Sequence, residues 1–216
     1  MRDAFHRELE SLDQAIVRMG ALVEQSIQMA TTALIEGDKE LARRVRQGDD
    51  AIDDLFLDVE KRSLALMAQQ APVAGDLRLI VAILRVVNDL ERAGDLAYNI
   101  AKLVQVEDVH DPELRGVRAL LADLGRESGR LLSAAIDAWA AKDDKLAADI
   151  ARQDDRLDDL HAQLIQHLVE LKGADALAPA IRLAMVGRYF ERIGDHAVNL
   201  GERVRYFVTG DEEHLG

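Results

Sequence analysis

The sequence repeats itself once, and this duplication restricts the chain to folds that can be built from two similar halves. Segment 49–55 reads DDAIDDL, and segment 154–160, which begins 105 residues later, reads DDRLDDL. Segment 91–95 reads ERAGD, and segment 191–195, which begins 100 residues later, reads ERIGD. The smaller second offset indicates a shorter turn between the two segments in the second copy. A repeat of this length is typical of a duplicated domain and not of a solenoid.

Both copies have the composition and the periodicity of long helices. Only 3 of the 216 residues are proline and 4% are aromatic, which favours helix over sheet. The middle of each copy carries an apolar stripe whose members alternate between spacings of four and three residues, as one side of a helix requires. We expect Gly48 in this stripe, and Gly94 in the next segment, to let neighbouring helices approach closely. The stripe consists of Leu41, Val45, Gly48, Ile52, Leu55 and Val59 in the first copy, and of Leu146, Ile150, Gln153, Leu157, Leu160 and Leu164 in the second.

Helix-ending and helix-capping residues divide the chain into six segments. Because short connections place consecutive helices antiparallel, we predict an all-α fold of two tandem, pseudo-symmetric three-helix bundles, over residues 1–107 and 108–216. Trp139 matches Leu34 by the offset of 105 residues, so we expect it in the core. The residues with the chemistry of helix stops and N-caps are Gly37–Asp38, Asp76, Asp111–Pro112, and Asp143 or Asp144. The predicted helices cover residues 3–36, 39–70, 77–106, 112–141, 144–172 and 179–208.

Each half carries two pairs of acids whose members are four residues apart, so that both carboxylates of a pair share one helix face. Like charges at this spacing destabilise a bare helix, and the pairs directly follow positions of the apolar stripes, so the carboxylates flank the helix contact. A quartet of carboxylates there needs a counter-charge, which hard cations with oxygen ligands supply. Two alternatives are a solvated acidic face and neutralisation by Arg92 and Arg192 without metal. The pairs are Asp49/Asp53 and Glu91/Asp95 in the first half, and Asp154/Asp158 and Glu191/Asp195 in the second.

The numbering of the acids predicts where they meet. In an antiparallel hairpin, facing residues have numbers with a constant sum, and Asp49 with Asp95 gives the same sum, 144, as Asp53 with Glu91. Half of this sum falls inside the turn predicted between the two helices. The acids of the second half share the sum 349, and its midpoint falls within residues 173–175, again a predicted turn. We therefore expect the acids of each half to lie level with one another across one helix pair.

The charge and the cysteine count exclude several classes of function. A formal net charge of −13 repels phosphate backbones, so we expect no binding to nucleic acid. The chain has no cysteine, and therefore no disulfide and no thiolate metal site. The longest apolar run is too short to span a bilayer. These features favour a cytoplasmic protein that reaches a membrane only through partner proteins.

Together with GDLRL at 75–79 and MGALVE at 19–24, the ERAGD and ERIGD segments resemble the PhoU family of phosphate-transport regulators. The resemblance covers the whole chain and both copies. It implies two three-helix bundles, and multinuclear clusters of divalent or ferric metal ions (Fe, Zn, Mn or Mg) held by the eight paired acids. A candidate partner contact is formed by Asp76 and Arg78, because the second copy has Ala176 and Ala178 in their place. Candidate additional ligands, or residues that support the ligands, are Asn99, Asn199, His196, Arg92 and Arg192.

The resemblance further implies a regulator and not an enzyme. Proteins of this family are cytoplasmic and often dimeric, and they act as negative regulators. They link the ATPase subunit of the phosphate ABC transporter to the sensor histidine kinase of the phosphate two-component system. We therefore expect a homodimer, peripheral to the inner membrane through these partners, that restrains phosphate uptake and the phosphate-starvation response.

Two other functions are compatible with a helical bundle. A ferritin-like di-iron oxidase requires two Glu-x-x-His motifs. This chain offers only Asp158-x-x-His161, and the matching residue of the first half is Phe56. A plain helical scaffold would carry the same acids without binding metal. Metal analysis of protein purified without chelator separates this scaffold from a metal-binding regulator.

Overall fold

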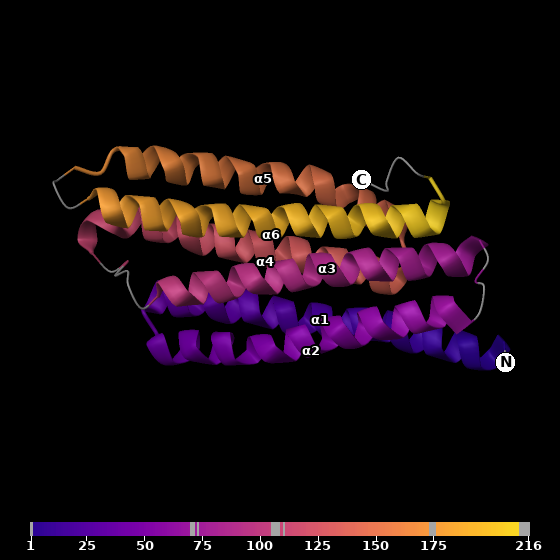
Figure 1. Cartoon of the computed structure of the whole chain (residues 1–216). Coiled ribbons are helices and arrows are strands. Elements are labelled where there is room, and N and C mark those ends of the chain that lie inside the picture. Colours follow the sequence, from indigo (N-terminus) through magenta and orange to yellow (C-terminus); the bar gives the residue numbers. More distant parts are fainter. Residues whose placement is uncertain are drawn as a thin grey trace.

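The computed structural model describes residues 2–69, 72, 74–104, 109, 111–172 and 176–211. All regular secondary structure in these residues is helical (Figure 1), so the predicted all-α fold of six long helices is confirmed. None of the described helices is long and apolar enough to cross a membrane. The elements are α1 (Arg2–Glu36), α2 (Lys39–Gln69), α3 (Ala74–Leu103), the 3₁₀ turn η1 (Pro112–Leu114), α4 (Arg115–Ala141), α5 (Asp144–Val169) and α6 (Leu177–Thr209).

Local capping explains where α2 and α5 begin. Asp38 Oδ1 accepts hydrogen bonds from the backbone N–H groups of Glu40 and Leu41, at 3.0 and 2.9 Å. Gly37 ends α1 with a left-handed φ of 67°, a conformation that glycine adopts without strain. Asp143 caps α5 in the same way as Asp38 caps α2. These caps satisfy backbone donors that have no partner inside the helix, and they confirm the predicted boundaries at both places.

Three other predicted helix ends are wrong. The chain enters α3 at Ala74, whose φ is 40°, so Asp76 lies in the first helical turn and does not cap it. Asp111 does cap the next helical segment, but residues 112–114 form the 3₁₀ turn before α4 begins. α5 ends at Val169, three residues before the predicted end. The predicted domain boundary at 107/108 and the turn predicted at residues 173–175 lie outside the described residues.

The helices pack as two three-helix bundles that share a core. α1, α2 and α3 contact one another, and so do α4, α5 and α6. The bundles meet because α1 packs on α4 and α3 packs on α6. In Figure 1 the end of α2 and the start of α3 lie at one end of the molecule, whereas the end of α5 and the start of α6 lie at the other. The two halves are therefore arranged antiparallel to each other.

Close packing between α1 and α4 makes Gly125 sensitive to substitution. A Cβ at Gly125 would overlap the side chain of Thr31, which is held in place because its Oγ1 donates a hydrogen bond to Ile27 O at 2.7 Å. We expect Gly125→Ala to lower the free energy of unfolding by about 1–3 kcal/mol, as overpacking of a core does. Urea denaturation measures this change.

Gly129 provides the matched control on the same helix. A Cβ at Gly129 would lie 3.8 Å from Ile27 Cγ2, an ordinary contact. Gly129→Ala should leave stability unchanged or raise it by about 0.5–1 kcal/mol, because alanine favours a helix interior. Equal stability of the two variants would show that α1 and α4 are not tightly packed at Gly125.

Candidate metal centres

The first acid quartet joins α2 to α3. Asp49 and Asp53 lie on α2, and Glu91 and Asp95 lie on α3. Burial, and then the charges of Asp53 and Asp95, raise the pKa of Asp49 to about 6. Burial also raises the pKa of Glu91, and the charges of Asp95 and Asp53 add to the effect. Charges act on one another this strongly only over about 10 Å or less, so the structure brings the four carboxylates together.

The second quartet repeats this arrangement on α5 and α6. Burial, and then the charges of Asp158 and Asp195, raise the pKa of Asp154 to about 6. Burial also raises the pKa of Glu191, with Asp195 as the strongest of the neighbouring charges. Asp49 and Asp154 are equivalent residues of the repeat, so the same pKa at both shows that the acidic environment is duplicated as well.

A glycine opposite each quartet lets a carboxylate approach the neighbouring helix. A Cβ at Gly194 would lie 2.6 Å from Asp154 Oδ1, and a Cβ at Gly94 would lie 3.9 Å from Asp49 Oδ1 and 3.2 Å from Ile52 Cδ1. The prediction for Gly94 is therefore confirmed. The prediction for Gly48 is wrong, because a Cβ there would meet open space.

The fit of a cation to the quartets can be tested on their oxygen atoms. Asp154 Oδ1 is buried and has no hydrogen-bond partner, a costly state for a carboxylate oxygen that a bound cation would relieve. The paired acids supply only oxygen ligands, which suit hard cations. In their present rotamers, no three His, Asp or Glu side chains of the described residues are placed to hold one metal ion. Asp53, Asp158 and Asp195 are exposed and can change rotamer at low cost, so the quartets are compatible with a cation.

Two of the candidate additional ligands point away from the second quartet. His196 Nδ1 lies 3.0 Å from Asp89 Oδ1, and Asn199 Nδ2 donates to the same oxygen at 3.2 Å. These contacts run from α6 to α3 and therefore join the two halves. Sequence reasoning missed Asp89, which is 8% exposed. The only signal was a lone acid within an apolar helix stretch.

The other three candidates, Arg92, Arg192 and Asn99, have less structural support as ligands or supporting residues. Arg92 lies 3.6 Å from Glu91 Oε2 and is 58% exposed, so water screens this pair strongly. Asn99 and Arg192 lie on α3 and α6 close to the quartets in sequence. Their roles as ligands or supporting residues stay predictions.

The candidate partner contact lies against the ends of its own chain. Asp76 Oδ2 is 3.8 Å from His6 Nε2 on α1. The guanidinium carbon of Arg78 lies 3.5 Å from the position that a Cβ on Gly210 would take, at the end of α6. Both side chains thus contact the terminal regions of the chain, and their role toward a partner stays a prediction.

Two further side chains lie beside the second quartet: Arg188, which sequence reasoning missed, and His161, which it considered only as part of an oxidase motif. Arg188 forms an ion pair with Glu191, three residues further along α6. His161 lies three residues after Asp158 on α5; burial, and then the charge of Arg188, lower its pKa. Its Nε2 atom is buried and has no hydrogen-bond partner. The spacing of three residues in both pairs was visible in the sequence as a helix-face signal.

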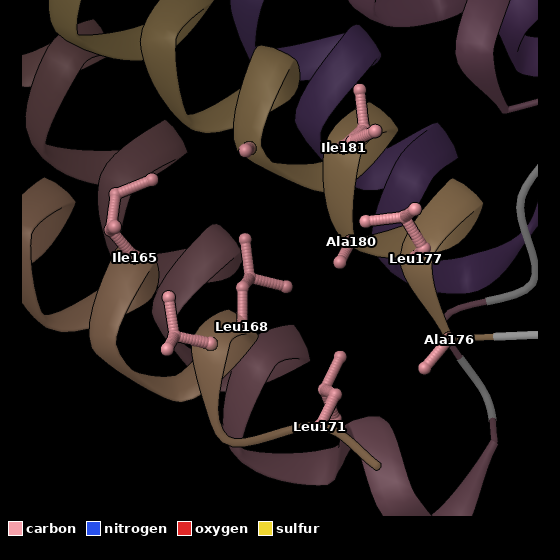
Figure 2. Close-up of a pocket in the computed structure, with 9 residues that line it drawn as sticks. Ile165, Leu168, Leu171, Ala176, Leu177, Ala180 and Ile181 are labelled. Carbon is pink, nitrogen blue, oxygen red and sulfur yellow. The ribbon is translucent and has the colours of Figure 1, made fainter. Parts of the chain in front are cut away.

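A separate apolar groove lies between the end of α5 and the start of α6 (Figure 2). Its volume is about 350 Å³, and Val169 and Leu177 beside it are 80% and 70% exposed. Figure 2 shows Ile165, Leu168 and Leu171 on one side of the groove and residues of α6 on the other. The described lining residues are all apolar, so the groove is unsuited to phosphate or cations, whereas exposed apolar patches of this kind are typical of protein contacts.

Comparisons with known proteins agree with the duplicated fold. The PhoU domain model matches residues 16–104 and 121–204, one match in each half. The chain is 34% identical to the phosphate-specific transport system accessory protein PhoU homolog 2 of Mycobacterium tuberculosis, over 97% of this chain and 99% of that protein. It is 35% identical to the PhoU homolog of Pseudomonas aeruginosa, over 98% of this chain and 88% of that protein.

Solved structures show the same architecture. The crystal structure of PhoU from Pseudomonas aeruginosa superimposes with a TM-score of 0.88 at 32% identity, covering 96% of this chain and all of that one. The phosphate transport system regulatory protein PhoU from Streptococcus pneumoniae superimposes with a TM-score of 0.86 at 28% identity, covering 96% of this chain and 98% of that one. Because the domain model matches both halves and the relatives align over nearly the whole length, this chain belongs to the PhoU family.

Proposed function

We propose that this protein is an accessory regulator of phosphate transport, which restrains phosphate uptake and the phosphate-starvation response when phosphate is plentiful. The relatives support the role through their names, which describe an accessory protein of the phosphate-specific transport system and a regulatory protein of phosphate transport. The observation that carries the proposal is the match to the PhoU domain in both halves, each of which presents the same carboxylate quartet.

The regulator would act as an adaptor between other proteins. The expected partners are the ATPase subunit of the phosphate ABC transporter and the phosphate sensor histidine kinase, with the protein itself a cytoplasmic homodimer that is peripheral to the inner membrane through these partners. The apolar groove between α5 and α6 supports a role in protein contacts more than a role in catalysis. Because the protein is strongly acidic, salt should weaken an electrostatic contact with a basic partner.

Metal binding at the quartets is the second part of the proposal. Asp49, Asp53, Glu91 and Asp95 would hold a cation between α2 and α3, and Asp154, Asp158, Glu191 and Asp195 would do so between α5 and α6. A bound cation supplies the positive charge that buried, mutually repelling carboxylates lack. The raised pKa values of Asp49 and Asp154 and the unpartnered Asp154 Oδ1 support this assignment.

The other functions considered from the sequence have less support. A ferritin-like oxidase needs a second Glu-x-x-His motif, and position 56, which matches His161, is phenylalanine. A metal-free scaffold would require the carboxylates to be neutralised by arginine. Arg92 is exposed and lies 3.6 Å from Glu91, so it does this poorly for the first quartet.

Deleting the gene tests the regulatory role. In a clean deletion grown at high phosphate, we expect the phosphate-starvation genes to be expressed at the level of phosphate-starved cells, because the negative regulator is missing. A reporter fused to a phosphate-starvation promoter measures this, and the intact gene supplied in trans should restore repression. Normal repression in the deletion strain would contradict the proposed role.

A further inference from the structure

The apolar groove between α5 and α6 combines a hollow with protruding side chains. Its volume of about 350 Å³ far exceeds the roughly 30 Å³ that one water molecule occupies in the liquid, so the groove has room for apolar side chains. Val169 and Leu177 line the groove and are 80% and 70% exposed. Figure 2 shows Leu177 and Ile181 on α6, across the groove from Ile165 on α5. One surface therefore presents both a hollow and the kind of side chain that fits into it.

The duplicated fold does not require this apolar surface, because the first half lacks it at matching positions. The repeat offset of 105 residues pairs Ile165 with Glu60, and the offset of 100 residues pairs Met185 with Arg85. Ile165 and Met185 are 37% and 45% exposed. The helix hairpin of the first half thus forms with charged residues where the second half exposes apolar ones. The exposed apolar side chains of the second half therefore call for a reason other than the folding of the hairpin.

The local charge indicates which kind of surface can cover the groove. The described lining residues fall within segment 160–186, which carries two acids, Glu170 and Asp175, and two basic residues, Lys172 and Arg182. This segment is formally neutral, whereas the whole chain has a net charge of −13. Two copies of such an acidic protein repel each other least where the local charge is zero, and a neutral patch gives a basic partner no electrostatic attraction. The charge distribution therefore favours a second copy of this chain over a basic partner.

We propose that the groove between α5 and α6 is the interface of a homodimer, in which each copy inserts Val169 and Leu177 into the groove of the other. An interface with two-fold symmetry uses the same patch on both subunits, so it needs protruding side chains and a hollow next to each other on one surface. The groove meets this requirement, and its neutral charge lets two acidic copies approach. This inference rests on the proposed homodimer and assigns its interface to the hairpin of the second half.

Sedimentation equilibrium of the full-length protein tests the inference. The parent should be a dimer at micromolar concentration. Val169→Glu/Leu177→Glu should raise the dissociation constant of the dimer at least about a hundredfold, because each charge enters the apolar contact twice. Both side chains are exposed in one copy, so the variant should fold as the parent does, which a circular-dichroism melt checks. The control is Leu64→Glu/Leu77→Glu, at the matching and also exposed positions of the first half, and it should leave the dissociation constant unchanged.

Cross-linking locates the contact without relying on a disruptive variant. The chain has no cysteine, so Val169→Cys gives each copy a single reactive thiol. A short bismaleimide should join two copies of Val169→Cys, and it should not join two copies of the control Leu64→Cys. High salt should leave the yield undiminished, because salt screens charges and the proposed contact is apolar. Cross-linking of Leu64→Cys in place of Val169→Cys would overturn the inference.

The other outcomes separate the inference from the proposed homodimer. A dimer that persists in Val169→Glu/Leu177→Glu would place the interface elsewhere and overturn the inference alone. Equal dissociation of Leu64→Glu/Leu77→Glu would show a general effect of added charge and would overturn it as well. A parent protein that is monomeric at all concentrations would overturn both the inference and the homodimer, and it would leave a different protein as the occupant of the groove. The regulatory role is tested separately by the gene deletion.

Discussion

In the presence of a chelator, the double variant Asp49→Asn/Asp154→Asn is expected to be more stable than the parent protein at pH 7, by about 2–4 kcal/mol after allowance for solvent screening. Burial and neighbouring carboxylates raise the pKa of both residues from 3.8 to about 6. The folded protein therefore binds more protons than the unfolded chain between these pH values. The stability that these two carboxyl groups contribute is fully present below pH 3.8, and it is lost as the pH rises through about 6. Asparagine has no proton to release and stays neutral as the pH rises, so the variant avoids this loss.

Urea denaturation at several pH values measures the effect. The two proteins should be nearly equal in stability at pH 4, and the difference should open as the pH rises to 7. Asp50→Asn/Asp155→Asn, at exposed neighbouring positions, is the control and should show little of this dependence. A difference that stays constant with pH would show that the amide acts through packing and not through charge.

Adding a cation should reverse the order of stability. A ligand that binds only the folded state stabilises it by about 4 kcal/mol at a thousand times its dissociation constant. The parent protein should gain this stabilisation, and the double variant should lose most of it because each quartet has lost a partly buried aspartate. A thermal melt with and without Mn²⁺ or Zn²⁺ makes the comparison directly.

Trp139→Ala is expected to lower the free energy of unfolding by about 3–5 kcal/mol, as truncation of a buried tryptophan does. Trp139 is fully buried on α4, and its ring centroid lies 5.2 Å from that of Phe207 on α6. Lys142 Nζ lies 4.6 Å from the Trp139 centroid and also pairs with Asp13 on α1. Lys142 therefore connects the surroundings of Trp139 to α1 of the other half, and a single cooperative unfolding transition should move as a whole.

Trp139→Phe is the matched control for this prediction. Phenylalanine keeps an aromatic ring for Phe207 and Lys142, and it removes an indole N–H that is buried without a hydrogen-bond partner. It should therefore lose far less stability than alanine. Separate unfolding of the two halves in the alanine variant, with one half unaffected, would contradict the view that they share one core.

The positions of most helices could be predicted from the sequence because the signals are local. An apolar stripe at helical spacing and an Asp cap such as Asp143 act within a few residues of themselves. The start of α3 was placed wrongly at Asp76 because the entry into a helix also depends on the backbone before it. Ala74, the first residue of α3, has a positive φ, and no side-chain pattern in the sequence indicates this. Gly48 was misjudged for a related reason, since a position within an apolar stripe need not face another helix.

The composition of each quartet was determined by the sequence by itself. Carboxylates four residues apart must share a helix face, and a short turn forces the two helices of a hairpin to run side by side, so acids at mirror positions must meet. The tertiary structure decided how far they are buried, and burial is the largest cause of the raised pKa values of Asp49 and Asp154. Desolvation depends on which atoms of other elements cover a carboxylate, and that is not encoded in the spacing of the acids.

Contacts between the halves were decided only by the tertiary structure. His196 follows Asp195 directly and was a candidate ligand, yet successive residues of a helix point about 100° apart. Its ring therefore points from the quartet toward α3, where its Nδ1 atom contacts Asp89 Oδ1. The side of α6 that packs on α3 is set by how two bundles with separate sequence patterns fit together. This fit depends on the shapes of both surfaces at once, which no periodicity within one helix contains.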